Sequence, residues 1–235
     1  MLPPQDLVAT HRIAQDAAKA VLRELAESLG PQDTEESIAS RAASALYKHG
    51  IRETWYYDCP ALVLLGSRSC TSLSGRNYRP QREPVGDTNL VTIDLSPSHE
   101  GHWGDCARSF PVEQGHVTAS PGNLALAAGV SFLRHLHSAM RSFVTPRTTF
   151  HELAMWAARQ IEASDFVNLD FRGNVGHSIV TRREDRLYIE AGNHRSLGEA
   201  SFFTFEPHVR ATAGTWGFKH EDIFFFNASG TLEEL

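Results

Sequence analysis

The chain has 235 residues, of which 41% are hydrophobic, so it is long enough to bury a substantial core and fits one domain over residues 1–235. Its 28 acidic and 22 basic residues give a formal net charge of -6, which provides no broad electropositive surface for a nucleic-acid backbone. Three cysteines without CxxC spacing, Cys59, Cys70 and Cys106, disfavour a disulfide framework or a zinc ribbon and suit a reducing compartment.

The sequence predicts neither a targeting segment nor a membrane span. The N-terminal MLPPQDLVATHR lacks the basic start and the apolar stretch of a signal peptide. No apolar run approaches the roughly 20 residues that a membrane helix needs. We therefore expect a cytoplasmic protein that acts on a peptide or small-molecule substrate, with no nucleic-acid or membrane partner. The sequence leaves open whether the chain forms a homodimer.

Two helices are predicted at the start of the chain. Apolar residues recur at helical spacing from about residue 6 to residue 29, and Gly30-Pro31 ends this segment. Thr34 precedes two glutamates, which favour the positive end of a helix dipole, so we expect a second helix to begin there and to end at Gly50.

Strands and a loop are predicted next. The segment TWYYDCPALVLLG, residues 54–66, is aromatic and aliphatic enough for a strand, and the polar residues 66–88 predict a loop. LVTIDLS and HWGDCARSFPV predict two neighbouring strands joined by a short turn, PSHEG. We expect these two strands to form a hairpin.

The second half of the chain repeats the order of helix, helix and strands. Ser120-Pro121 predicts the start of a helix that ends near Phe143, and Thr149 with Glu152 forms a capping-box pattern for a helix to about Ala163. From residue 166 onward the pattern indicates strands and turns. VTIDLSP and FTFEPHV share a strand-Thr-apolar-acid pattern, which supports an internal pseudo-repeat.

Four carboxylates interrupt apolar, strand-like runs in this sequence. They are Asp94, Asp105, Glu206 and Glu221. Burying any of these acids alone would cost several kcal/mol, so each needs a cation or strong hydrogen-bond donors. Each of three acids also has a purely structural alternative. Asp94 could cap the turn at Ser96-Pro97, Asp105 could pair with Arg108, and Glu221 could lie in a solvated turn.

One histidine stands in a similar setting. His177 lies in GNVGHSIV, although a lone histidine in such a run is more often a core residue. Four carboxylates and one imidazole offer too many oxygens for a structural zinc site. They suit two adjacent divalent metal ions, and oxygen-rich ligation with one histidine indicates manganese, iron, cobalt or catalytic zinc.

The order Asp, Asp, His, Glu, Glu resembles methionine aminopeptidase, aminopeptidase P and prolidase, the pita-bread metallopeptidase family. GDCARSF and LYIEAGNHRSLGEASFFTFEP are similar to the family's segments around its second aspartate and first glutamate. The resemblance covers almost the whole chain, without the family's extra N-terminal domain. It implies an α+β pita-bread fold, a pseudo-two-fold repeat of helices packed on a curved, mainly antiparallel sheet.

The resemblance also implies a role for each of the five residues. Asp94 would bind one ion, Asp105 and Glu221 would bridge both ions, and His177 with Glu206 would bind the other. A water held between the ions would be the nucleophile, and Glu206 would move its proton. His177 and Glu206 are therefore the expected catalytic residues.

Two substrate-binding histidines of the aminopeptidases are replaced in this chain. Ser74 stands at about the position of the first, and Glu184 at that of the second. This loss should weaken peptide cleavage more than metal binding. Other substrate-contact candidates, each of which could equally be a packing or surface residue, are His208, His220 and His102 with Trp103. Arg182, Arg183 and Arg186 either bind a substrate carboxylate or form a solvated loop.

Three functions remain open from the sequence. The first is a dinuclear-metal hydrolase, an aminopeptidase or Xaa-Pro-type peptidase. The second is a metalloenzyme on the same fold that hydrolyses a non-peptide amide or performs a lyase step, since fold does not fix function. The third is a non-catalytic binding protein, which the retention of all five ligands disfavours.

Overall fold

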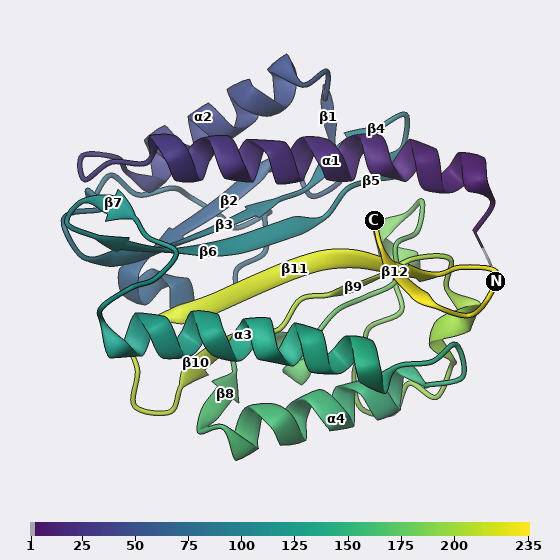
Figure 1. Ribbon diagram of the computed structural model, residues 1–235. Coiled ribbons are helices and arrows are strands. Elements are labelled where there is room, and N and C mark those ends of the chain that lie inside the picture. The colour runs from purple at the N-terminus through teal and green to yellow at the C-terminus, as the bar shows by residue number, and fades with distance from the viewer. Residues whose placement is uncertain (1–2) are drawn as a thin grey trace.

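The computed structural model describes residues 3–235, and its first half places two helices over one face of a curved sheet (Figure 1). The buried side chains of these helices form one apolar core with the strands beneath them. The helices are α1 (Gln5–Ser28) and α2 (Glu35–Lys48), and the strands are β2 (Ala61–Leu65), β3 (Asn89–Leu95) and β6 (Cys106–Glu113). The predicted cap at Thr34 is confirmed, because its side chain accepts a hydrogen bond from the amide of Ser37.

The second half repeats this arrangement with a separate apolar core. Two helices pack on the strands of this half, α3 (Leu124–Phe143) and α4 (Phe150–Ala163). The strands are β8 (Phe166–Asn168), β9 (Phe203–Phe205), β10 (His208–Ala211) and β11 (Gly217–Phe226). Figure 1 shows the two helix pairs on opposite sides of the drawing, with β11 running between them. The predicted order of helix, helix and strands in each half is confirmed.

One antiparallel sheet joins the two halves, in the strand order β2-β3-β6-β11-β10-β8. Three further strands pair at its margins: β9 and β12 (Leu232–Glu234) with β11, and β7 (His116–Val117) with β6. A small second sheet contains β1 (Glu53–Thr54), β4 (Pro97–His99) and β5 (His102–Trp103). The join between β6 and β11 brings the acids of the two halves together.

The predicted hairpin exists, but its connection is longer than a simple turn. β3 pairs with β6, and β4 with β5 forms a second, shorter hairpin between them. Its two turn residues, Glu100 and Gly101, both have positive φ, which is typical of a type I′ turn. The predicted strand over residues 102–112 is therefore interrupted at Gly104 and Asp105.

Two predictions about element boundaries were wrong. Helix α3 begins three residues later than the Ser120-Pro121 pattern indicates, because the Asn123 side chain caps the helix by accepting from the amides of Ala125 and Leu126. The Glu113 carboxylate also accepts from the amides of Gly122 and Asn123, at 2.8 and 2.6 Å, and fixes this start.

The aromatic segment TWYY is not a core strand. Tyr57 and Asp58 have φ of 53° and 55°, which no strand allows, so the chain turns before β2 begins at Ala61. Trp55 and Tyr56 are only half-buried and face a cavity instead.

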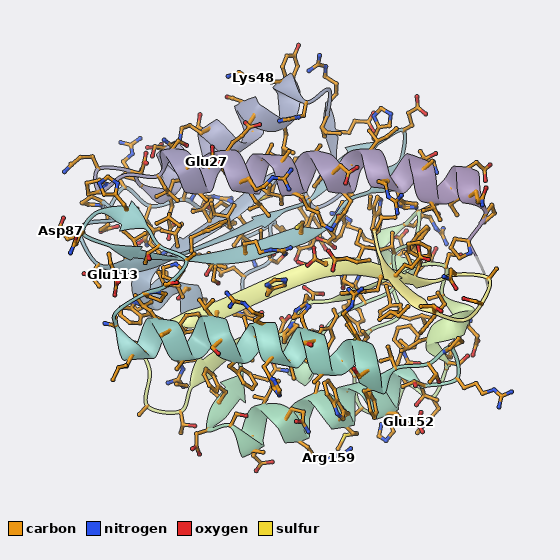
Figure 2. All side chains as sticks on the ribbon, in the orientation of Figure 1. Glu27, Lys48, Asp87, Glu113, Glu152 and Arg159 are labelled. Carbon is orange, nitrogen blue, oxygen red and sulfur yellow. The ribbon has the colours of Figure 1, made fainter. Side chains whose placement is uncertain are left out.

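Charged side chains cover the outer surface of the helices. Glu27, Lys48 and Arg159 project away from the sheet in Figure 2, and all three are exposed or half-buried. No helix within residues 3–235 combines the length and the apolar character that crossing a membrane requires.

Candidate metal centre

Three neighbouring strands place two of the predicted acids in one row. Asp94 of β3 lies opposite Ala107 of β6, and Ala107 lies opposite Glu221 of β11. Residues opposite one another in an antiparallel sheet project from the same face, so both carboxylates and the Ala107 methyl group share a face. The small side chain of Ala107 leaves room between the two acids.

Asp105 is brought to the same place by helix α1. The fully buried side chain of Gln15 accepts from the Asp105 amide at 2.8 Å and donates to its carbonyl oxygen at 3.1 Å. Gly104 allows this close approach, since a Cβ atom there would lie 2.7 Å from the carbonyl carbon of Ala14. The alternative of an Asp105–Arg108 pair is wrong, because Arg108 forms a bidentate ion pair with Asp222.

His177 is held as a neutral metal ligand would be. Its Nδ1 lies 3.0 Å from the Ser178 carbonyl oxygen, an acceptor, so Nδ1 carries the proton and Nε2 offers a lone pair. Burial, with the nearby Arg186 guanidinium, lowers the pKa of His177 to about 3. Nε2 lies 3.5 Å from Asp105 Oδ2 and 3.6 Å from Glu206 Oε1.

Glu206 follows directly after β9. Its amide donates to the Val175 carbonyl oxygen at 2.8 Å, and its Oε1 accepts from the Thr204 hydroxyl at 3.3 Å. Gly176 makes this packing possible, because its φ is +149° and a Cβ atom would lie 2.2 Å from the Thr204 carbonyl oxygen. This close approach explains the glycine before the histidine.

The buried carboxylates lack enough hydrogen-bond donors. Burial, with the other carboxylates of the cluster, raises the pKa of both Asp105 and Glu221 well above the usual range. In the described part of the chain, Asp105 Oδ2 and Glu221 Oε1 have no hydrogen-bond donor, and Glu221 Oε2 has only an ion pair with Lys219 Nζ at 3.3 Å. Ligand atoms of Asp105, His177 and Glu221 lie within 4.8 Å of one another. Orphaned oxygens beside an imidazole lone pair fit a divalent cation.

The sequence did not single out Lys219, which lies inside this cluster. Its Nζ is 2.6 Å from Asp94 Oδ2, 3.0 Å from Glu206 Oε2 and 3.3 Å from Glu221 Oε2. Burial would lower its pKa, but the attraction of Asp94, Glu221 and Glu206 outweighs burial and leaves the pKa well above the usual range. The ammonium group therefore stays charged. The signal was the two-residue spacing in GFKHED, which puts Lys219 and Glu221 on one face of β11.

A cavity of about 530 Å³ opens onto these residues. Ser74 and His208, two predicted substrate contacts, line it. Glu184, His102 and His220 do not line it. The Glu184 side chain is 69% exposed and lies 4.0 Å from Arg182, His102 packs edge-on against His11, and His220 lies beside His137. His208 is already engaged, since its Nε2 lies 2.6 Å from the Ser69 carbonyl oxygen.

Aromatic rings and one arginine form another wall of this cavity. Arg186 lies over Trp55 and Tyr188, 5.4 and 5.3 Å from the ring centroids, and its Nη1 is 3.5 Å from His177 Nε2. No carboxylate in residues 3–235 forms an ion pair with it. The sequence predicted a strand over TWYY and gave no sign of this wall, because the composition does not show the turn at Tyr57.

A second group of ligand-type residues lies on the opposite face of β11. His137, His220 and Asp222 come within ligand distance of one another. However, Arg108 binds both Asp222 oxygens, and Lys19 Nζ lies 3.6 Å from one of them. Two cations already neutralise this carboxylate, so it suits a metal ion less well than the cluster around Glu221.

Similar folds occur among solved structures. X-Pro aminopeptidase from Thermotoga maritima has a TM-score of 0.80 at 17% identity, covering 100% of this chain and 62% of that one. Prolidase from Pyrococcus furiosus has a TM-score of 0.80 at 16% identity, and the match covers 99% of this chain and 64% of that one. Methionine aminopeptidase from Thermotoga maritima has a TM-score of 0.79 at 14% identity, and the match covers 100% of this chain and 98% of that one. The chain thus spans less than two thirds of the first two proteins.

These similarities and the curved sheet define the pita-bread fold that the sequence predicted. The sequence matches metallopeptidase family M24 over residues 9–228. The chain belongs to this family, in agreement with the resemblance seen in the sequence. A comparison with curated proteins gives no match.

Proposed function

We propose that this chain is a metal-dependent peptidase of the aminopeptidase or Xaa-Pro type, and that residues 1–235 act as one catalytic domain. One observation carries the proposal: buried carboxylate oxygens without a hydrogen-bond donor among the described residues lie beside the unprotonated Nε2 of His177, at a cavity large enough for a short peptide. Besides these acids, the one polar side-chain neighbour of Nε2 in residues 3–235 is Arg186, whose Nη1 lies at 3.5 Å. Family membership supports the reaction class. Cytoplasmic location and homodimer formation stay predictions from the sequence.

Four residues provide the ligand atoms for a divalent cation: Asp105, His177, Glu206 and Glu221. Their oxygen-rich set fits manganese, iron, cobalt or zinc. A cation bound there supplies Lewis-acid activation of water and of the substrate carbonyl. The predicted second ion, which would use Asp94, stays a prediction because the Lys219 ammonium group lies against that carboxylate.

Glu206 is the candidate for proton transfer. Its carboxylate borders the cavity, and the Thr204 hydroxyl orients Oε1 by a hydrogen bond. A carboxylate in this position can take a proton from the attacking water and deliver it to the leaving amine. His177 is kept neutral by burial and so serves as a ligand and not as the acid.

Arg186 favours a substrate with a free carboxylate. Its guanidinium group lines the cavity and contacts aromatic rings, without an acidic partner in the described chain, and guanidinium groups bind carboxylates in bidentate geometry. Aromatic rings beside it suit an apolar or proline side chain. We therefore place dipeptides and short free-acid peptides first among the substrates.

The test is turnover of a panel of Xaa-Pro and Met-Ala peptides after loading with Mn²⁺, Co²⁺ or Zn²⁺. We expect hydrolysis of at least one peptide, loss of hydrolysis on chelation, and a fall of about 100-fold or more in kcat for Glu206→Gln. No hydrolysis of any peptide by protein that has bound metal would contradict the proposal.

A second candidate is a metalloenzyme that acts on a non-peptide small molecule. Its supporting observation is the altered substrate wall, where Ser74 lines the cavity and Glu184 points to solvent in place of two histidines. Metal-bound protein that leaves all peptides intact but hydrolyses a small amide would favour this candidate. Bound metal with neither activity would favour the binding-protein alternative.

A further inference from the structure

We infer that the Lys219 ammonium group takes the place of a second metal ion, so that this chain binds one divalent cation per active site. The inference rests on the proposed function, because it concerns the same carboxylate cluster. The sequence-based expectation was two ions. The difference lies in the cationic side chain of Lys219, which occupies the position next to Asp94.

The position of Lys219 follows from the strand that carries it. Lys219 and Glu221 alternate on β11 and so project from the same face. The Lys219 amide donates to the Ser109 hydroxyl at 2.8 Å, and the residue pairs with His208 across the sheet. Its side chain is only 14% exposed, so the ammonium group is directed into the cluster and not toward bulk water.

The contacts of the ammonium group match those of a bound cation. Nζ contacts one oxygen each of Asp94, Glu206 and Glu221, at 2.6, 3.0 and 3.3 Å. Of the two ions that the sequence predicted, only the second would use Asp94 as a ligand. A divalent ion at this carboxylate would lie within a few ångströms of Nζ, where like charges repel strongly in a buried site.

The two carboxylate oxygens of Glu206 face two different cation positions. Oε2 lies 3.0 Å from Lys219 Nζ, whereas Oε1 lies 3.6 Å from His177 Nε2. On the His177 side, Asp105 Oδ2 and Glu221 Oε1 have no hydrogen-bond donor among the described residues. The unsatisfied oxygens thus gather around one position, and the ammonium group holds the other.

The charge count also favours a single ion beside Lys219. The four carboxylates Asp94, Asp105, Glu206 and Glu221 carry four negative charges when ionised. One divalent ion and Lys219 together carry three positive charges, which leaves the Arg186 guanidinium group for a substrate carboxylate. Two divalent ions with Lys219 would carry five positive charges, an excess of one, and Arg186 at the same cavity would add another.

The test is metal stoichiometry, measured without substrate by Mn²⁺ calorimetry and by elemental analysis after dialysis. We expect one ion per chain in the wild type. Lys219→Met removes the charge but keeps an unbranched apolar stem, so Asp94 becomes free to bind and we expect two ions. Lys48→Met is the matched control on exposed α2, as Figure 2 shows, and should bind one ion.

Two ions in the wild type, or one ion in both Lys219→Met and Lys219→Ala, would overturn the inference. No bound ion in the wild type would overturn it as well. Circular dichroism establishes that each variant is folded, and if neither variant folds, the wild-type stoichiometry decides alone. Peptide hydrolysis with two bound ions would contradict only this inference, whereas one bound ion without hydrolysis would contradict only the proposed function.

Discussion

Arg186 is half-buried, and its guanidinium group lines the cavity and contacts aromatic rings instead of acids. We expect Arg186→Gln to raise KM for a free-acid dipeptide about tenfold or more, since one charge-assisted contact contributes roughly 1.5–3 kcal/mol. KM for the corresponding dipeptide amide should change little. Steady-state kinetics on both substrates provide the measurement.

Exposed Arg159 on α4 provides a control of equal charge (Figure 2). Arg159→Gln should keep the wild-type preference for the free acid. If Arg186→Gln raised KM for the free-acid dipeptide and for the dipeptide amide by the same factor, Arg186 would not bind the substrate carboxylate and would only support His177.

At the residue scale, the acids could be predicted and their cationic neighbour could not. Asp94, Glu206 and Glu221 stand out because each interrupts an apolar run, and buried charge needs compensation. Lys219 is followed by three polar residues in GFKHED, and one lysine beside them gives no sign of burial. Its burial depends on β11 lying between β6 and β10, which local sequence does not show.

At the element scale, helix α1 positions the second aspartate through one buried side chain. Gln15→Leu would leave both the amide and the carbonyl of Asp105 unpaired, at roughly 1–3 kcal/mol for each. We expect a lower melting temperature and weaker Mn²⁺ binding. Thermal unfolding with and without Mn²⁺ measures both effects.

The neighbouring Asp16 is exposed on the same helix, so Asp16→Asn should behave as the wild type does. Unchanged Mn²⁺ affinity in a folded Gln15→Leu protein would show that Asp105 does not need the helix to reach the metal.

The packing of α3 on β11 makes stability depend on pH. His137 lies 3.0 Å from the His220 carbonyl oxygen, and burial, with the neighbouring His220, lowers its pKa well below the usual range. The unfolded chain therefore binds a proton that the folded chain excludes, so this contribution to stability falls as pH drops below about 6.5.

We expect His137→Gln to remove that dependence. Between pH 6 and pH 5, the unfolding free energy of the wild type should fall about 1.2 kcal/mol more than that of the variant. Urea denaturation of metal-free protein measures it, with His135→Gln on the exposed side of α3 as the control. If the unfolding free energies of the wild type and of His137→Gln changed with pH in parallel, His137 would not be the source of the pH dependence.

Helix positions were predictable because their signals are local. The caps at Thr34 and Thr149 lie where the sequence indicated. The start of α3 was not predictable, because the Glu113 carboxylate accepts from the amides of Gly122 and Asn123 and overrides the Ser-Pro pattern. The strand prediction for TWYY was wrong because the backbone turns at Tyr57 and Asp58, so that this segment lines the cavity.

At the scale of the whole molecule, the two-part repeat follows from the repeated order of elements. Each half covers its strands with two helices, and the halves share the β6–β11 join. Sequence order predicted this architecture, and the family match agrees with it. Which side chains line the cavity depends on that join and on the turn geometry, so Ser74 and Glu184 could not be told apart beforehand.

Anomalous diffraction at the manganese edge, from crystals soaked in Mn²⁺, would locate the bound ion directly. We expect a strong peak bounded by Asp105, His177, Glu206 and Glu221. The contradicting result is a well-ordered cluster without a peak, or manganese found instead at the group of His137, His220 and Asp222.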